Sequence, residues 1–205
     1  MRLRIMRHGA TASNEAHRYA GRATDEPLSV AGRRQCQVAG VFPQVEKVYV
    51  SPLLRACESA AICFPDARQV KVPGLEEFDF GVFEGRSADE LADDSAYRKW
   101  VDGGCVAACP SGDSRERYVA RVGDAFERLV HDAAGRGERE LTIVAHGGTI
   151  MALLSAFADS RAEGFTGYDD YFCWQVGPTQ GYEASIQIEG DSLRIEDVRR
   201  WPDAV

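Results

Sequence analysis

The sequence has no apolar run close to the roughly 18 residues that a membrane-spanning helix needs. Its 205 residues are 44% hydrophobic and 27% charged, near the averages for soluble globular proteins. The first residues carry charge but lack the apolar stretch and small-residue cleavage site of a secretory signal peptide. These absences predict a soluble, cytoplasmic protein that does not act at a membrane.

The sequence also lacks an excess of basic residues. Its 24 Lys and Arg are outnumbered by 32 Asp and Glu, which gives a formal net charge of −8. A nucleic-acid surface normally needs a clustered basic face to neutralise a run of phosphates. We therefore expect no nucleic-acid partner, whereas a small phosphorylated metabolite needs only a few local cations.

Paired cysteines are missing too. The six cysteines include no C-x-x-C pair, and their irregular spacing does not indicate a disulfide framework. Cys105 and Cys109 are the nearest pair, but no second pair of zinc-ligand type accompanies them. The cysteines are predicted to be free thiols: Cys36, Cys57, Cys63, Cys105, Cys109 and Cys173.

Hydrophobic patterning predicts alternating strands and helices. The predicted strands are residues 2–6, 45–50, 69–72 and 141–145, followed by a hairpin of 182–188 and 193–198 around Gly190. The predicted helices start near Ser29, Pro52, Asp113 and Thr149, and Ser51-Pro52 is interpreted as a helix cap followed by proline at the first helical position.

This alternation indicates an α/β fold: a three-layer αβα sandwich with a mostly parallel sheet and helices on both faces. Residues 74–112 show no sustained period and are predicted to form a small cap insertion within a single domain spanning residues 1–205.

Two histidine-glycine turns follow predicted strands. His8 comes after the first strand with Arg7 beside it, and His146 comes after the 141–145 strand. Ligands of such sheets bind beyond the carboxyl ends of the strands, so both histidines are expected at one edge. Arg55 would join them, because guanidinium forks suit phosphate oxygens. Taken singly, each histidine could be structural and Arg55 could be a solvated helix residue.

Several ordered motifs resemble the histidine phosphatase superfamily, in its phosphoglycerate-mutase-like branch that includes α-ribazole and broad-specificity phosphatases. The resemblance covers nearly the whole chain. The motifs are Arg7-His8-Gly9-Ala10-Thr11 with Asn14, Tyr19-Ala20-Gly21 with Asp25-Glu26-Pro27-Leu28-Ser29, Ser51-Pro52-Leu53-Leu54-Arg55-Ala56, Leu75-Glu76-Glu77-Phe78-Asp79-Phe80-Gly81 and His146-Gly147-Gly148.

The resemblance implies a reaction without metal or cofactor. His8 would attack phosphorus through a neutral nitrogen while a loop carbonyl holds the proton on its other nitrogen. Arg7, Arg55 and His146 would stabilise the phosphoryl oxygens, and Glu77 would be the general acid. The implied substrate-binding residues are Arg7, Asn14, Gly21, Arg55, His146 and Gly147. For Glu84 a structural role is favoured.

Three alternatives to a phosphatase stay open: a mutase that passes phosphohistidine to a second hydroxyl, a silent phospholigand-binding protein, and a metal-dependent hydrolase. The short distance from Glu77 to Pro110 favours the phosphatase over a cofactor-dependent mutase. The predicted substrate is a small organic phosphate, and α-ribazole phosphate is one candidate. Whether the chain forms a homodimer is left open. Four cap-side aromatic residues are candidates to line an apolar pocket: Phe83, Tyr97, Trp100 and Trp174.

Overall fold

The fold is built on one mixed sheet. A computed structural model describes residues 1–158, 168–190 and 192–202. In this part of the chain the sheet has six strands in the order β3-β2-β4-β1-β5-β6. The four strands β3, β2, β4 and β1 run parallel to one another. Strand β5 pairs antiparallel with β1, and β6 pairs antiparallel with β5. The α/β class with a mostly parallel sheet is therefore confirmed.

The elements follow the predicted order along the chain. The strands are β1 (Arg2–Arg7), β2 (Lys47–Val50), β3 (Arg68–Lys71), β4 (Glu140–Ala145), β5 (Gly181–Glu189) and β6 (Ser192–Trp201). The helices are α1 (Ala12–Glu15), α2 (Val30–Ala39), α3 (Leu54–Cys63), α4 (Ala88–Leu91), α5 (Ser95–Asp102), α6 (Arg115–Gly135) and α7 (Gly147–Phe157), with 3-10 turns η1 (Gly81–Phe83) and η2 (Tyr168–Trp174).

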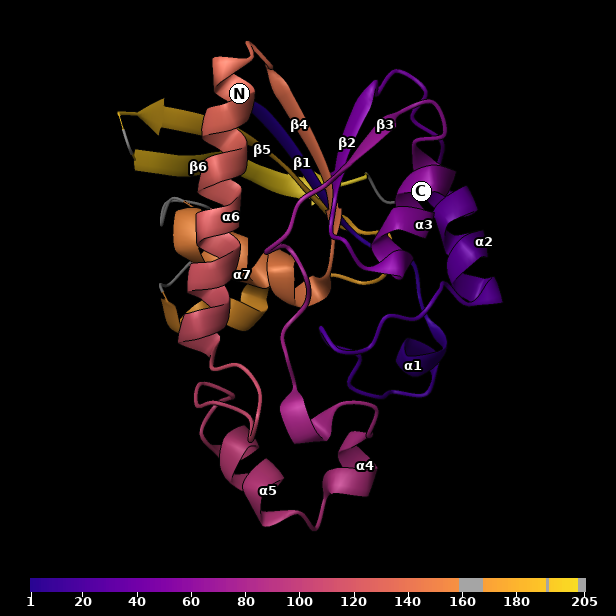
Figure 1. The fold of residues 1–205 in the computed structure, drawn as a ribbon, viewed down its shortest axis with the longest axis vertical. Coiled ribbons are helices and arrows are strands. Elements are labelled where there is room, and N and C mark those ends of the chain that lie inside the picture. Colours follow the sequence, from indigo (N-terminus) through magenta and orange to yellow (C-terminus); the bar gives the residue numbers. More distant parts are fainter. Residues whose placement is uncertain (159–167, 191, 203–205) are drawn as a thin grey trace.

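Helices cover both faces of the sheet, α6 and α7 on one side and α2 and α3 on the other (Figure 1). Successive side chains of a strand point to opposite faces. Accordingly, Ile5 and Ile143 pack in the cluster that contains α6 and α7. Met6 and Val144 are buried in the cluster that contains residues of α2 and α3. The central strands β1 and β4 therefore bury apolar side chains on both sides, as expected for parallel strands with two covered faces.

The start of α3 differs from the sequence prediction. Its N-cap is Leu53, which makes no side-chain capping bond, and the helix begins at Leu54. Ser51 is fully buried, and its hydroxyl meets the ring of His146 at 2.7 Å. The interpretation of Ser51 as a helix cap is therefore wrong: its hydroxyl is engaged by a residue from another strand end.

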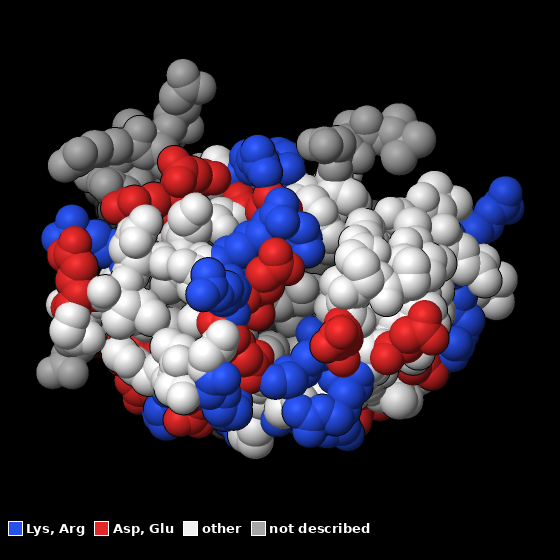
Figure 2. Space-filling model, turned by 90° about the horizontal axis from the view of Figure 1, so that it is seen from above, with Lys and Arg blue, Asp and Glu red and all other residues white. Residues whose placement is uncertain are grey.

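The predicted cap insertion contains η1, α4 and α5, which lie beyond the carboxyl ends of the parallel strands (Figure 1). Three aromatic side chains give it a core: Phe83, Tyr97 and Trp100 are each less than 10% exposed and contact one another in edge-on or tilted arrangements. At the opposite end of the molecule, basic and acidic side chains lie interspersed over the surface (Figure 2). Within the described residues, no helix is both long and apolar enough to cross a membrane.

Candidate active site

The two histidine turns lie side by side. They follow β1 and β4, neighbouring parallel strands in which Arg7 pairs with Ala145. The backbone N–H of His8 donates to the Ala145 carbonyl at 3.0 Å, which extends the ladder one residue past β1. The His8 and His146 ring centroids are 5.1 Å apart in an edge-on arrangement. The shared strand edge thus brings together two residues 138 positions apart in the sequence.

The His8 ring is held in one tautomer. Its Nδ1 lies 2.6 Å from the carbonyl oxygen of Gly9, and a carbonyl can only accept, so Nδ1 carries the proton. Burial, followed by the charges of Arg55 and Arg7, lowers the pKa of His8 well below its ordinary value of 6.5. The ring is therefore neutral, and its Nε2 presents a lone pair.

The loop that supplies this carbonyl is tightly packed. A Cβ on Gly9 would lie 2.6 Å from the Gly32 carbonyl oxygen and 2.9 Å from the Cys36 sulfur. The Gly9 N–H donates to the Ser59 hydroxyl at 2.9 Å. Glycine is needed here because any side chain would push the loop off α2 and move the carbonyl that holds His8.

His146 is connected differently, because both of its ring nitrogens have protein partners. Nε of Arg55 donates to Nδ1 of His146 at 3.3 Å, so the proton of the neutral ring lies on Nε2. That nitrogen donates to the Ser51 hydroxyl at 2.7 Å. Burial and then the charge of Arg55 lower the pKa of His146 well below 6.5. His146 is thus a neutral ring fixed between an arginine and a serine.

Arg55 is fully buried and is held by backbone carbonyls of the 20–24 loop. Its guanidinium donates to the carbonyls of Ala20, Gly21 and Thr24 as well as to His146. Burial lowers its pKa from the ordinary value of 12.5. The carbonyl dipoles point at the cation and keep its fork in place.

Glu84 in turn holds the 20–24 loop. Its carboxylate accepts from the Gly21 N–H at 2.9 Å and from the Thr24 hydroxyl at 2.7 Å. A Cβ on Gly21 would lie 2.1 Å from the Phe78 carbonyl oxygen. These contacts give Glu84 a structural role, which is the role favoured from the sequence.

Arg7 presents an unsatisfied donor. Its Nη1 donates to the Val176 carbonyl at 2.8 Å. Its Nε is buried and has no hydrogen-bond partner within the described part of the chain. Gly147 faces this group, since a Cβ there would lie 3.6 Å from the Arg7 Nε. A buried N–H without a partner is costly, and an anion bound at this point would satisfy it.

Glu77 is oriented by three donors. Its Oε1 accepts from the Tyr118 hydroxyl at 2.7 Å and from the Phe78 N–H at 2.9 Å, and its Oε2 accepts from the Gly148 N–H at 3.1 Å. Burial, followed by the charge of Glu77, raises the pKa of Tyr118 well above its ordinary value, so the hydroxyl stays protonated. The Tyr118 hydroxyl also contacts Thr149 at 3.1 Å.

A cavity of about 360 Å³ opens between the strand ends and the cap. Arg7, Asn14, Glu77 and Gly147 line it. His8 is 3% exposed and Arg55 and His146 are fully buried; these three do not contribute to its lining. The other lining residues are Arg18, Tyr19, Ala20, Phe78, Phe80, Trp100, Cys105, Arg115, Gly148, Met151, Tyr171, Phe172 and Gln175.

The comparisons with known proteins decide the family. A model of the histidine phosphatase superfamily (branch 1) matches residues 3–173. The chain belongs to this superfamily.

Relatives of this histidine phosphatase superfamily member include both mutases and phosphatases. A probable phosphoglycerate mutase, GpmB, of Proteus mirabilis is 31% identical over 211 residues, covering 97% of this chain and 96% of the relative. The fructose-2,6-bisphosphatase TIGAR of Xenopus tropicalis is 29% identical over 175 residues, covering 78% of this chain. That match spans only 62% of the length of TIGAR.

A solved structure has the same fold over nearly its full length. It is the crystal structure of a candidate alpha-ribazole-5′-P phosphatase from Escherichia coli, which aligns with this superfamily member at a TM-score of 0.73 and 25% identity. The alignment covers 95% of this chain and 94% of that one. The sheet and its helices are therefore the superfamily's architecture.

The structure brings most of the predicted site residues of this superfamily member together. His8, Arg55 and His146 form one buried cluster, and Arg7 and Glu77 line the adjoining cavity. Asn14 lies in the cavity wall, where its Oδ1 also accepts from the Thr11 N–H. Gly21 does not line the cavity; it is buried and supplies the carbonyl that accepts from Arg55.

The prediction that four aromatic residues line the pocket is correct for one of them and wrong for three. Trp100 lines the cavity, but Phe83, Tyr97 and Trp174 are buried and do not. Aromatic residues that the sequence did not single out replace them: Tyr19, Phe78, Phe80, Tyr171 and Phe172. Phe78 and Phe80 lie in the same motif as Glu77, and their closeness in sequence to the expected general acid could have indicated them.

Two polar residues at the site were missed from the sequence. Ser51 orients His146, and Tyr118 orients Glu77. Ser51 precedes a proline and resembles a helix cap, whereas Tyr118 has the helical spacing of a core residue. All six cysteines are free thiols. Within the described residues, no group of three His, Cys, Asp or Glu side chains is arranged to hold a metal ion.

Proposed function

We propose that this protein is a metal-independent phosphomonoester hydrolase that works through a phosphohistidine on His8. The observation that carries the proposal is the hydrogen bond from His8 Nδ1 to the Gly9 carbonyl, which leaves a neutral ring with Nε2 free. A nucleophilic histidine needs this tautomer, because a protonated Nε2 has no lone pair to give.

The first half-reaction transfers the phosphoryl group to the enzyme. The Nε2 lone pair of His8 forms a bond to phosphorus as the bond from phosphorus to the ester oxygen breaks. Among the described residues, Oε2 of Glu77 accepts only the Gly148 N–H, so this oxygen can also carry the proton that the leaving oxygen takes. The free alcohol then departs through the cavity.

The second half-reaction returns the enzyme to its starting state. Water gives a proton to Glu77 while its oxygen bonds to phosphorus, and the bond from phosphorus to His8 breaks. Inorganic phosphate leaves with the fourth oxygen from water. Tyr118 keeps the Glu77 carboxyl aimed at the same point through both steps.

Charge on the phosphoryl oxygens is stabilised by protein groups. Arg7 offers its buried Nε, which has no hydrogen-bond partner in the part of the chain that the structure describes, and Arg55 places its positive charge beside His146. The Nε2–H of His146 can exchange the Ser51 hydroxyl for an equatorial phosphoryl oxygen. Fixed cations and donors in a buried site supply the charge stabilisation that a metal ion supplies in other phosphatases.

The nature of the acceptor separates this proposal from its main alternative. A mutase would pass the phosphoryl group to a second hydroxyl instead of water, and the similarity to GpmB over 97% of the chain favours that reading. The 33 positions from Glu77 to Pro110 favour water, because the resemblance to cofactor-dependent mutases would imply a longer insertion after Glu77. We propose a small organic phosphate as the substrate, with α-ribazole phosphate as a candidate from the similarity to the Escherichia coli structure.

Hydrolysis of para-nitrophenyl phosphate in EDTA tests the proposal. Wild type is expected to turn over, and His8→Ala is expected to be inactive. Activity that disappears with EDTA and returns with a divalent cation would favour a metal-dependent hydrolase. Phosphate binding without any turnover would favour a silent binding protein, and transfer only to a second phosphorylated sugar acid would favour the mutase.

A further inference from the structure

One end of the cavity is built for an anion. Arg7 lines it, and the Arg7 Nε is buried without a hydrogen-bond partner in the described residues. Glu77, Gly147 and Gly148 lie in the same wall. The rest of a bound phosphate ester must therefore extend into the part of the cavity that remains.

Aromatic rings dominate that remaining part. Four rings form one continuous surface: Tyr19 and Phe80 have centroids 4.8 Å apart, Phe78 and Phe80 5.0 Å, and Tyr19 and Trp100 6.2 Å. They come from the loop after α1, the segment before η1, and α5. Such a wall binds flat apolar groups and offers few partners to a polyhydroxylated sugar.

Arg115 lies in the cavity wall against two aromatic rings. Its guanidinium lies 4.7 Å from the Tyr171 ring centroid and 5.1 Å from that of Phe172. It also donates to the Gly104 carbonyl, and the residue is only 6% exposed. The cation thus packs beside a second pair of aromatic rings at cation–π distance.

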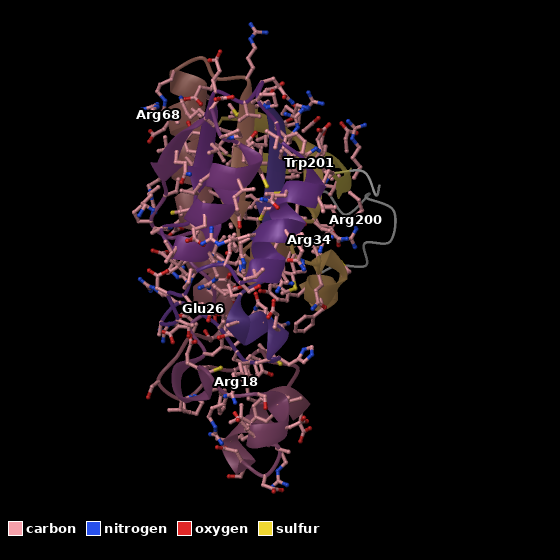
Figure 3. All side chains as sticks on the ribbon, turned by 90° about the vertical axis from the view of Figure 1, so that its right-hand side faces the viewer. Arg18, Glu26, Arg34, Arg68, Arg200 and Trp201 are labelled. Carbon is pink, nitrogen blue, oxygen red and sulfur yellow. The ribbon has the colours of Figure 1, made fainter. Side chains whose placement is uncertain are left out.

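Arg18, a further cation of the wall, is paired with a carboxylate. Its Nη1 lies 2.9 Å from Oε2 of Glu90 and also donates to the Gly85 carbonyl. Figure 3 shows Arg18 where the loop after α1 meets the cap. A second anionic group of a ligand would have to displace Glu90 to reach it.

We infer that the leaving group is a flat, apolar and uncharged alcohol, so that the substrate is the monophosphate ester of an aromatic alcohol with no second phosphate or carboxylate. That such an ester is turned over as a substrate rests on the proposed function. The preference of the cavity for binding flat apolar groups does not depend on turnover. It disfavours α-ribazole phosphate, whose ribose lies between the phosphate and the flat base, and it also disfavours bisphosphates and phosphoglycerate, whose second anion would have to displace Glu90 from Arg18.

Binding of phosphonates tests the preference without any chemistry. Titration calorimetry of the wild-type protein should compare benzylphosphonate, methylphosphonate and phosphonoacetate. Benzylphosphonate is expected to bind about tenfold or more tightly than methylphosphonate, because it buries an additional ring. Phosphonoacetate is expected to bind no more tightly than methylphosphonate. Equal binding of the first two, tightest binding of phosphonoacetate, or no binding of any would overturn the inference.

The variant Phe172→Ala locates the preference in the cavity. Phe172 is 48% exposed, so its removal should leave the fold intact. We expect it to weaken benzylphosphonate about threefold or more while methylphosphonate is unchanged, since a ring contact is lost and the anion end is not. Val101→Ala, on an exposed position of α5 outside the lining, is the control and should change neither. Equal weakening of both ligands by Phe172→Ala would contradict the assignment.

Turnover gives a separate readout. Benzyl phosphate and glycerol 2-phosphate both release an alkyl alcohol, so a difference between them reports the cavity more than the leaving group. We expect a kcat/KM ratio of about ten or more in favour of benzyl phosphate. If neither ester nor para-nitrophenyl phosphate is hydrolysed but the phosphonate order holds, the proposed function fails and the ligand preference stands. Efficient hydrolysis with glycerol phosphate preferred would refute the preference and leave the function standing.

Discussion

The turns after β1 and β4 have the same local design and different connections. Each consists of a strand, a histidine and a glycine, and both imidazoles are buried and neutral. His8 donates from Nδ1 to the carbonyl of the neighbouring Gly9, and its Nε2 carries no proton. His146 uses both nitrogens, one with Arg55 and one with Ser51. The role of a histidine in this fold is therefore set by contacts from distant segments.

Removal of each histidine in turn tests the difference between the two turns and should have the largest effects. His8→Ala should lower kcat by about 10³-fold or more, because the nucleophile is gone. His146→Ala should lower it by about 10²-fold, since one donor to the phosphoryl group and the support of Arg55 are lost. Rapid quench with radiolabelled substrate should detect a phosphoenzyme in His146→Ala and none in His8→Ala. A labelled His8→Ala protein would mean that the roles are reversed.

Removing the acid that serves the His8 step should have the next largest effect. Glu77→Gln should slow release of an alkyl alcohol by about 10²-fold and that of para-nitrophenol by much less, because only the alkoxide needs a proton. The measurement is kcat for benzyl phosphate against para-nitrophenyl phosphate. Glu76→Gln is the matched control, as Glu76 contacts Arg121 and the Gly74 N–H instead of the cavity. Equal losses on both esters would contradict the general-acid assignment.

The contact that distinguishes His146 can be removed without touching either histidine. Ser51→Ala should lower kcat by about tenfold with a smaller change in KM, because the imidazole loses the partner that holds its ring in position until a phosphoryl oxygen replaces that partner. Ser155→Ala is the control, because the Ser155 hydroxyl donates to the Ala152 carbonyl of its own helix and Ser155 is not among the residues that line the cavity. Wild-type kcat in Ser51→Ala would show that this hydrogen bond plays no part in the chemistry.

The shared property of the two rings predicts a pH effect on stability. The folded-state pKa of each is below the unfolded value near 6.5, so on acidification the unfolded chain takes up protons first. The free energy of unfolding should therefore fall as the pH drops below about 6.5, by at most about 1.4 kcal/mol per pH unit for each histidine.

Urea unfolding at pH 7.5, 6.5 and 5.5 measures this dependence. The double variant His8→Ala/His146→Ala should have a shallower slope below pH 6.5 than wild type. Exposed His131→Ala serves as the control and should keep the wild-type slope. Glu138 and Glu183 have folded pKa values of about 2. The stability that they contribute is therefore lost at pH values below 5.5, and they should not change the slope between pH 7.5 and 5.5. Identical slopes for the double variant and wild type would contradict burial of neutral rings.

Strand positions and glycine turns were enough to predict which edge of the sheet carries His8 and His146, because parallel strands place their carboxyl ends together. Contacts across long sequence distances were not predictable in this way. Ser51 lies beside a proline, which dominates its local pattern, and Tyr118 lies on an apolar helix face, which conceals its hydroxyl. The cavity aromatics depend on how the cap folds back, and residues 74–112 carry no period that reveals it.

The contact between Glu84 and the 20–24 loop has a consequence for how such proteins could diversify. The first part of the insertion is hydrogen-bonded to the segment that holds Arg55. Glu84 accepts from the Gly21 N–H, and the Gly85 N–H donates to the Tyr19 carbonyl. Replacement of the whole insertion would therefore disturb the buried arginine along with the entrance. A graft that keeps residues up to Arg86 and exchanges α4 and α5 would leave the catalytic loops supported while replacing the Trp100 wall. New specificity in this chain is thus easier to acquire from the outer half of the cap than from the inner half.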